Sequence, residues 1–284
     1  MSVHAQTNEI QLNKTWLTGS CGAVLHDVDI AKGVDQPLFE AIHGALMEHG
    51  VIFFRDQDIT RDQHKAFGSL FGKLHYHPAA PGPEGHPEIL IIHADENSTY
   101  SAGQGWHSDV SCDEEPPMGS ILRLETVPET GGDTLFSNMY AAYEALSDRM
   151  KNLITGMTAV HSGKHVYAGR YNVSADKMVR EYPESEHPMV RTHPVTKRPA
   201  LFVNSGFTTH IVGMKPKESK AVLEHLYQHI ALPDFQCRFH WEPSSIAFWD
   251  NRCVQHHAVF DYWPEVRHGE RVTVAGDKPY YEPA

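Results

Sequence analysis

Five pairs of residues in the sequence place a carboxylate two positions after a histidine. On a β-strand, residues i and i+2 point to the same face, so each pair could hold one metal ion. The pairs are His86/Glu88, His93/Asp95, His107/Asp109, His240/Glu242 and His268/Glu270. Since the chain contains 21 histidines, such pairs also arise by chance, and most should be surface or satisfied core residues. The surroundings of each pair therefore decide which of them could bind a metal.

The pair His107/Asp109 has the most suitable surroundings. It follows two glycines and a tryptophan and precedes a valine. The pair His93/Asp95 is its main competitor, because it closes an apolar segment that is typical of a strand. The other three pairs lie in a proline-rich loop or among charged and turn-forming residues, which favours a position on the surface.

A third ligand has to come from a distant part of the chain. The candidate is His256, at the end of the segment Trp249-Asp-Asn-Arg-Cys-Val-Gln-His256. Two histidines and one carboxylate on one face of a metal form the facial triad of non-haem iron(II) oxygenases. Such a triad leaves coordination positions open for a bidentate co-substrate and for O2. The neighbouring His257 is a rival for the third ligand.

Two arginines follow His256 at a short distance and could hold an anionic co-substrate. The planar guanidinium group of Arg267 or Arg271 can pair with a carboxylate through two hydrogen bonds. A single arginine is usually a solvated surface charge, but two so close to a candidate ligand favour an anion site. If a turn at Gly269 separates them, the two need not share one face of a strand.

Charge and cysteine content exclude several classes of protein. With 24 basic and 36 acidic residues the formal net charge is −12, which argues against nucleic acid and anionic membranes as partners. The four cysteines have no C-x-x-C spacing, which argues against zinc ribbons and thioredoxin-like sites. No signal peptide or apolar stretch of transmembrane length is expected. We therefore expect a cytoplasmic protein with free thiols.

Several elements must position these candidates. Thr60-Arg-Asp-Gln63 resembles a capping box that begins a helix. Helices are predicted over 36–50, 60–71, 139–154 and 217–230. Strands are predicted over 51–54, 88–92, 119–124, 134–136, 200–203, 236–241, 245–249 and 271–274. This order favours an antiparallel β core that carries helices, in a single domain over residues 1–284.

Eight stretches of this sequence resemble the TauD/TfdA family of Fe(II)/2-oxoglutarate-dependent dioxygenases, with a closer likeness to its taurine dioxygenase branch. They follow one another in order along nearly the whole chain. The stretches are Val51-Ile-Phe-Phe-Arg-Asp-Gln57, Trp106-His-Ser-Asp109, Gly131-Gly-Asp-Thr134, Ala141-Ala-Tyr-Glu-Ala-Leu146, Arg191-Thr-His-Pro194, Phe202-Val-Asn-Ser-Gly-Phe-Thr-Thr209, Trp249-Asp-Asn-Arg252 and Gly276-Asp-Lys-Pro279.

The resemblance implies a mainly β fold with helical insertions around a double-stranded β-helix, or jelly-roll, core. It implies Fe(II) bound by His107, Asp109 and His256, with 2-oxoglutarate and O2 as co-substrates. By position, Arg267 matches the family arginine that holds the distal carboxylate of 2-oxoglutarate, and Thr134 assists it. The implied reaction turns 2-oxoglutarate into succinate and CO2 while a C–H bond of the substrate is hydroxylated.

The resemblance also implies a substrate pocket. Arg271 and His77 match the residues that meet the anionic head of the substrate, and Phe207 matches an aromatic wall. Val110 and Gly103 are expected to line the same pocket.

The chain departs from the taurine dioxygenase pattern at three places. Ala80 stands where that enzyme has a tyrosine, Gly103 where it has an asparagine, and Ser162-Gly163 where it has a phenylalanine. We therefore expect a roomier pocket for a small organic anion that is bulkier than taurine. Alkyl or aryl sulfonates, sulfate esters and related acids fit this description. A homo-oligomer is also expected.

Two other functions remain compatible with the residues. A zinc hydrolase can use two histidines and a carboxylate to activate water, although no general base is evident beside these ligands. A jelly-roll module that binds a ligand without catalysis is the second alternative.

Overall fold

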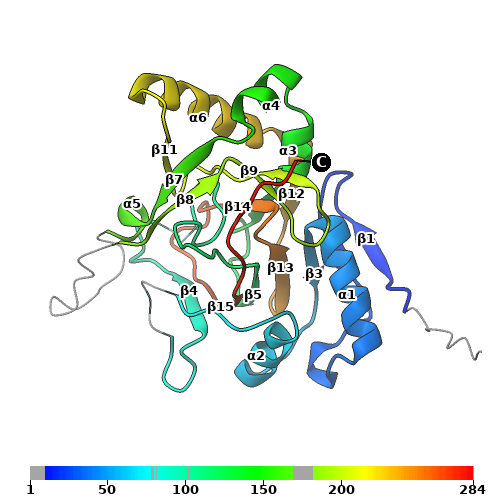
Figure 1. Ribbon diagram of the computed structural model, residues 1–284. Helices are drawn as coiled ribbons and strands as arrows, with labels where there is room; N and C mark the ends of the chain where they lie inside the picture. The colour runs from blue at the N-terminus through cyan, green and yellow to red at the C-terminus, as the bar shows by residue number, and fades with distance from the viewer. Residues whose placement is uncertain (1–9, 78–79, 81, 101–102, 169–181, 284) are drawn as a thin grey trace, which may run out of the picture.

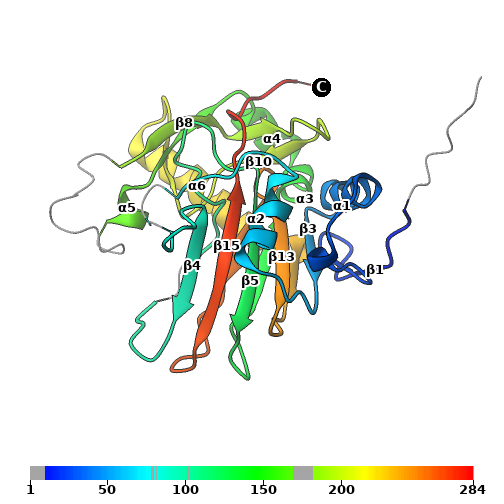
Figure 2. The same ribbon diagram turned by 90° about the horizontal axis from the view of Figure 1, so that it is seen from below.

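The largest sheet of the protein has seven strands. The computed structural model describes residues 10–77, 80, 82–100, 103–168 and 182–283. The strand order in the sheet is β1-β2-β3-β13-β5-β15-β4, and all neighbours are antiparallel except β2 and β3 (Figures 1 and 2). Its strands are β1 (Lys14–Trp16), β2 (Ala23–Leu25), β3 (Val51–Phe54), β13 (Ser245–Asp250), β5 (Gly119–Thr126), β15 (Arg267–Val274) and β4 (Ile89–Ala94).

Three smaller sheets complete the β structure. Their strand orders are β12-β6-β14, β11-β7-β8 and β10-β9. Their strands are β12 (Gln236–Phe239), β6 (Thr134–Asn138), β14 (Val254–Ala258), β11 (Thr208–Ile211), β7 (Thr158–Ser162), β8 (Glu184–Pro188), β10 (Pro199–Leu201) and β9 (Val190–Thr192). The protein is therefore mainly β, as predicted.

The seven-stranded sheet packs face to face against the β12-β6-β14 sheet. Phe53 of β3 stacks on Phe239 of β12 with ring centroids 3.9 Å apart, and its ring edge meets Phe136 of β6 at 5.5 Å. Trp249 of β13 also contacts Phe136, at 5.7 Å. All four aromatic side chains are almost completely buried, so this inter-sheet layer forms the main hydrophobic core.

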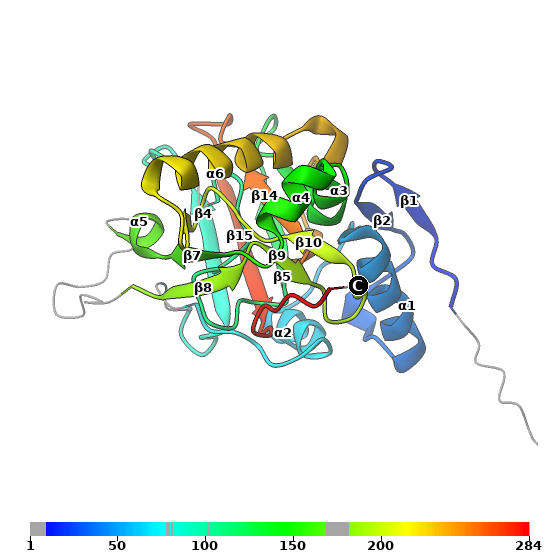
Figure 3. The same ribbon diagram turned by 45° about the horizontal axis from the view of Figure 1, so that its top comes forward.

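Helices cover the outer faces of both sheets. Figures 1 and 2 show α1 and α2 beside the large sheet, and Figure 3 shows α3, α4 and α6 gathered over the opposite side of the molecule. Phe67 and Phe71 fix α2 by packing on Phe248 of β13. The helices are α1 (Gln36–His49), α2 (Arg61–Ser69), α3 (Met139–Glu144), α4 (Asp148–Ile154), α5 (Lys164–Tyr167) and α6 (Pro216–Ile230). Within the described ranges, no helix is both long and apolar enough to cross a membrane.

One predicted helix is in fact two. The segment 139–154 divides into α3 and α4, because the Ser147 hydroxyl accepts a hydrogen bond from the Met150 amide and starts a new helix. The capping box at Thr60 and Gln63 is confirmed, since each side chain bonds the other residue's backbone amide.

Candidate active site

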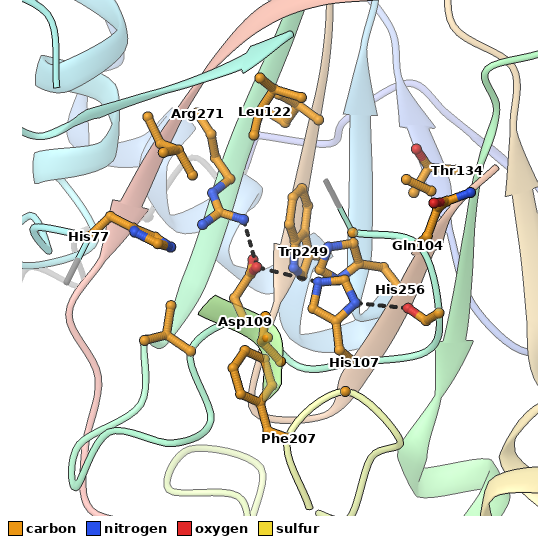
Figure 4. A pocket seen from close by; sticks show the side chains of 18 of the residues that line it. His77, Gln104, His107, Asp109, Leu122, Thr134, Phe207, Trp249, His256 and Arg271 are labelled. Atoms are coloured by element: carbon orange, nitrogen blue, oxygen red, sulfur yellow. Dashed lines mark hydrogen bonds and ion pairs between the residues drawn. The ribbon is translucent and has the colours of Figure 1, made fainter. Parts of the chain in front are cut away.

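Three side chains from two distant parts of the chain converge between the two main sheets. The ligand atoms of His107, Asp109 and His256 all lie within 4.8 Å of one another. Nε2 of His107 is 3.7 Å from Oδ1 of Asp109, and the two imidazole rings are 4.1 Å apart between centroids (Figure 4). The structure thus brings together the three residues selected from the sequence.

The backbone explains why His256 and not His257 joins this group. His107 and His256 exchange two backbone hydrogen bonds of 3.2 and 3.0 Å, which hold the segment before β5 against β14. Neighbouring residues of a strand point to opposite faces. The ring of His257 accordingly turns outward and packs edge-on against Trp106.

The atoms of these three side chains are suited to a divalent metal. Nδ1–H of His107 donates to the Gly105 carbonyl at 2.9 Å, which leaves Nε2 free to act as a ligand. Burial, then the neighbouring His107, holds the pKa of His256 well below its usual range, so its ring stays neutral. Two neutral imidazoles and one carboxylate make the donor set of a facial triad.

Asp109 is fixed by contacts on every side. Ser120 Oγ donates to its Oδ2 at 2.7 Å and Arg271 Nη1 donates to its Oδ1 at 2.6 Å. Asn251 brackets its backbone, accepting from the Asp109 amide at 2.6 Å and donating to its carbonyl at 2.9 Å. Burial opposes ionisation of this carboxyl, but the charge of Arg271 outweighs it and holds the pKa of Asp109 well below its usual range.

The residue after Asp109 is strained. Val110 has a φ of +49°, a conformation that β-branched residues rarely adopt. Strain of this kind persists only where surrounding contacts enforce it, and the two hydrogen bonds between Asn251 and Asp109 supply that enforcement. The buried side chain of Val110 lines the cavity in front of the three convergent residues.

Arg267 and Arg271 share one face of one strand. The turn considered at Gly269 is wrong, because β15 runs without interruption from Arg267 to Val274. The register shift beside Gly269 adds the extra residue, Glu125, to β5 and leaves the alternation of β15 intact. Both arginines therefore point into the same cavity, which they both line.

Arg267 is a buried cation that makes only neutral hydrogen bonds. Its Nε donates to the Gly132 carbonyl at 3.1 Å and its Nη2 to Thr134 Oγ1 at 3.4 Å. Trp241 Nε1 donates to the same threonine oxygen at 3.0 Å, and the guanidinium lies over the indole ring. Asp133, the nearby carboxylate, pairs instead with Arg238 and His240. Among the described residues, Arg267 thus has no carboxylate partner.

His77 and Arg271 lie on one side of the three convergent residues, and Thr134 lies on the other (Figure 4). Burial, followed by the charge of Arg271, lowers the pKa of His77 to about 3, so its imidazole is neutral at physiological pH. Phe207 closes the cavity from below, with its ring centroid 6.4 Å from that of His107. The cavity is therefore cationic at both ends and aromatic at its floor.

The expectation of a roomier pocket needs correction at Gly163 and not at Gly103. Gly103 lines the cavity, but its φ of +88° favours glycine for a backbone reason. A Cβ there would make only an ordinary contact with His107 Cε1, at 3.4 Å, so glycine leaves space at this point. At Gly163 the space is filled, since a Cβ would lie 2.7 Å from the ring of Tyr167. Ala80 is not among the residues that line the cavity.

Neither rival cluster has the properties of an open metal site. His93 and Asp95 lie 3.6 Å apart, but His93 is 46% exposed, and among the described residues no third ligand joins them. A second buried group contains His193, Asp250 and Cys253. There, Arg252 donates to both oxygens of Asp250, so a cation already neutralises that carboxylate.

Sequence reasoning missed three residues that position the site. Ser120, Trp241 and Asn251 each hold a candidate residue through a hydrogen bond to its side chain or backbone. Asn251 lies in the segment between Trp249 and Arg252 that was already selected, and an amide side chain shortly before a candidate ligand was the available signal. The other two bonds depend on strand register.

Comparison with protein families assigns the chain. The model of the taurine catabolism dioxygenase TauD, TfdA family matches residues 14–273. The chain belongs to this family. An alkylsulfatase of Acinetobacter baylyi is 34% identical, with 95% of this chain and 86% of the relative covered. An alpha-ketoglutarate-dependent sulfate ester dioxygenase of Pseudomonas putida is 34% identical, with coverage of 95% and 91%.

A solved structure supports the assignment. The crystal structure of a taurine dioxygenase from Burkholderia xenovorans superimposes with a TM-score of 0.81 at 37% sequence identity, covering 94% of this chain and 92% of that one. Together with the family match, this makes the TauD, TfdA family member described here an alpha-ketoglutarate-dependent dioxygenase.

Proposed function

We propose that this enzyme uses Fe(II), 2-oxoglutarate and O2 to hydroxylate a small organic anion with a sulfonate, sulfate-ester or related acid group. One observation carries the proposal: two buried arginines, Arg267 and Arg271, project from one face of β15 to opposite sides of the His107, Asp109 and His256 group. Two separate anions, a co-substrate and a substrate, explain the need for two buried cations in one cavity.

His107, Asp109 and His256 would hold the metal. When bound, Fe(II) supplies the activation of O2 that is coupled to decarboxylation of 2-oxoglutarate. The protein supplies the geometry, because Gly105, Ser120 and Asn251 orient the ligands through hydrogen bonds. The resulting arrangement of strands is proposed to be a double-stranded β-helix core within a single domain.

Arg267 would hold the distal carboxylate of 2-oxoglutarate. Its guanidinium is fixed by Gly132, Thr134 and the Trp241 ring, so little freedom is lost on binding. A carboxylate would also satisfy a buried charge that lacks an acidic partner in the described part of the chain. Thr134 would keep its place through the bond from Trp241.

Arg271 would bind the anionic head of the substrate, and His77 would add a neutral hydrogen-bonding group beside it. Phe207 and Val110 would enclose the body of the substrate, and Gly103 would leave space next to His107. The two relatives named for sulfate-ester and alkylsulfatase activities support this substrate class. If the hydroxylated carbon bears sulfur or oxygen, the product would fall apart by cleavage of that carbon–heteroatom bond.

Substrate-coupled succinate release tests the proposal. The iron-loaded enzyme would be supplied with 2-oxoglutarate under air and with alkyl sulfates, alkyl and aryl sulfonates, aryloxy acids or taurine. We expect succinate to form at a rate that depends on the organic anion, with a lower kcat/KM for taurine than for bulkier anions. Turnover that continues without 2-oxoglutarate or O2 would instead indicate a hydrolase.

A further inference from the structure

Tyr167 forms part of the cavity wall, although it is not among the residues predicted from the sequence. It is the last residue of α5, it is only 5% exposed, and it lines the cavity. Its ring meets His77 and Phe207 in edge-on contacts, with centroid distances of 5.7 and 5.9 Å. Both neighbours belong to the proposed substrate side of the site. The phenol ring therefore bounds the space in which the body of a substrate would lie.

Two further residues hold the ring of Tyr167 in this position. Cys112 Sγ donates to its hydroxyl oxygen at 3.8 Å. Gly163, one helical turn earlier, faces the ring directly: a Cβ there would lie 2.7 Å from Cε2 and 2.8 Å from Cδ2. Because the φ of Gly163 is an ordinary −74°, its backbone does not require glycine. The ring does require it, since any larger residue at 163 would displace the phenol.

These contacts explain how the pocket keeps its aromatic wall. The chain lacks a large side chain at Ser162 and Gly163, and the ring of Tyr167 occupies that volume from the following turn. Cys112, Val110 and Phe207 pack with Tyr167 in one small apolar cluster. The size of the substrate pocket therefore depends on how far the phenol ring reaches into the cavity.

We propose that Tyr167 determines the length of substrate body that the enzyme accepts. Gly163 determines how far the Tyr167 ring extends into the cavity, because it leaves room for the ring behind it. This inference rests on the proposed function, because it concerns the same cavity and the same class of organic anion. The geometry makes Tyr167 a specificity residue and Gly163 a positioning residue that acts through it.

A series of linear alkyl sulfates of increasing chain length tests the proposal. Tyr167→Ala should shift the optimum of kcat/KM toward longer chains, with a gain of about fourfold for each additional methylene that becomes buried. Dissociation constants measured without O2 should shift in the same direction. Tyr167→Phe retains the ring and should keep the parent's optimum. Tyr143→Ala removes a tyrosine ring that does not line the cavity and should leave the whole profile unchanged.

Gly163→Ala provides the reciprocal test. Its methyl group should push the phenol into the cavity and lower kcat/KM for the longest accepted sulfates by about fourfold per excluded methylene. In the Tyr167→Ala background the same methyl meets no ring, so the Gly163→Ala effect should largely disappear. This non-additivity separates a steric effect of the ring from general destabilisation.

The outcomes distinguish the two proposals. An active parent whose chain-length profile is the same in Tyr167→Ala, with unchanged thermal stability, would overturn the role of Tyr167 alone. If Tyr167→Ala does not fold, Tyr167→Leu gives the same test with a smaller change in volume. A parent that releases no substrate-dependent succinate with any organic anion would overturn the proposed function, and this inference with it.

Discussion

Arg271 is in direct contact with Asp109. Its Nη1 lies 2.6 Å from Oδ1 of Asp109, the same oxygen that lies 3.7 Å from Nε2 of His107. The cation proposed to meet the substrate head therefore also touches a proposed metal ligand. A metal ion and Arg271 are like charges that share one carboxylate, and a substrate anion would draw the guanidinium away from it. Metal binding and substrate binding should consequently be coupled.

Replacing Arg271 by methionine tests this coupling. Without the neighbouring cation, Fe(II) affinity in the absence of substrate should rise at least threefold, or about 0.7 kcal/mol. In contrast, kcat/KM for anionic substrates should fall by about 30-fold or more, because the anion loses a charge-assisted bond. Competition with a chromophoric chelator measures the first effect. Arg198→Met removes an exposed cation paired with Glu144 and should change neither value. Weaker Fe(II) binding in Arg271→Met would contradict the coupling.

The adjacent histidines of β14 offer a matched pair for the metal assignment. His256→Ala should abolish iron retention and turnover, because it removes one of the three proposed ligands of the convergent group. His257→Ala should retain iron, because this ring faces Trp106 on the other side of the strand. Metal content after gel filtration and succinate formation check both variants. The reverse result would show that His257 is the ligand.

Co-substrate binding should depend on Arg267. Arg267→Ala should weaken 2-oxoglutarate binding by roughly 2–5 kcal/mol, the usual loss for a buried charge-assisted contact. Arg267→Lys should be nearly as poor, because lysine lacks the planar fork. Trp241→Phe should cause a smaller loss of 2-oxoglutarate affinity, since it removes the bond to Thr134 but keeps an aromatic ring beside Arg267. Anaerobic titration of the iron-loaded enzyme with 2-oxoglutarate measures these changes. Equal affinity in Arg267→Ala and the parent would refute the role.

Two buried histidines predict that acid destabilises the fold. Burial lowers the pKa of His64 to about 4 and, in a different part of the core, that of His161 to about 3. In the unfolded chain each titrates near pH 6.5, so below that pH the unfolded state binds more protons. Their contribution to the free energy of unfolding is fully present above about pH 6.5. It is lost as the pH falls toward the pKa values of the folded state.

At about pH 5.5, each of these histidines should lower the free energy of unfolding by roughly 1 kcal/mol relative to neutral pH. Urea unfolding at a series of pH values measures this effect as a slope, the change in the free energy of unfolding with pH. His161→Asn can retain a bond to Ser111, where Nδ1 of His161 now lies 3.0 Å from the hydroxyl, and should give a shallower slope. His210→Asn replaces an exposed histidine and should leave the slope unchanged. A parent as stable at pH 5.5 as at pH 7.5 would contradict this prediction.

Short sequence patterns correctly predicted the helices that are stabilised by interactions between residues close together in the chain. The capping box at Thr60 and the apolar face of α1 both lie within a few residues of sequence, and both elements were predicted. The boundary between α3 and α4 was missed, because Ser147 is an N-cap inside an otherwise continuous helical pattern. Strand β14 was also missed, since Val254-Gln-His-His-Ala258 has no alternating apolar pattern and gains its pairing from β6.

The site was predictable only where residue type and family resemblance agreed. His107, Asp109 and His256 were selected on chemistry, and the structure brings them together. The contact between Arg271 and Asp109, and the ring of Tyr167 over Gly163, depend on strand register and on packing between distant segments. No local pattern in the sequence encodes such distances, so the pocket appeared larger from the sequence than it is in the folded protein.

Strand β15 fixes the distance between the two arginines of the cavity. Arg267 and Arg271 are four residues apart on one extended strand, so their Cα atoms are separated by roughly 13 Å of backbone that cannot flex like a loop. Under the proposed roles, this spacing fixes where the acid head of a substrate sits relative to the bound keto acid. The position of the carbon that reacts is then determined by its distance from the anionic head of the substrate. Lengthening the tail adds atoms at the far end, so the regiochemistry of oxidation should stay constant along a homologous series.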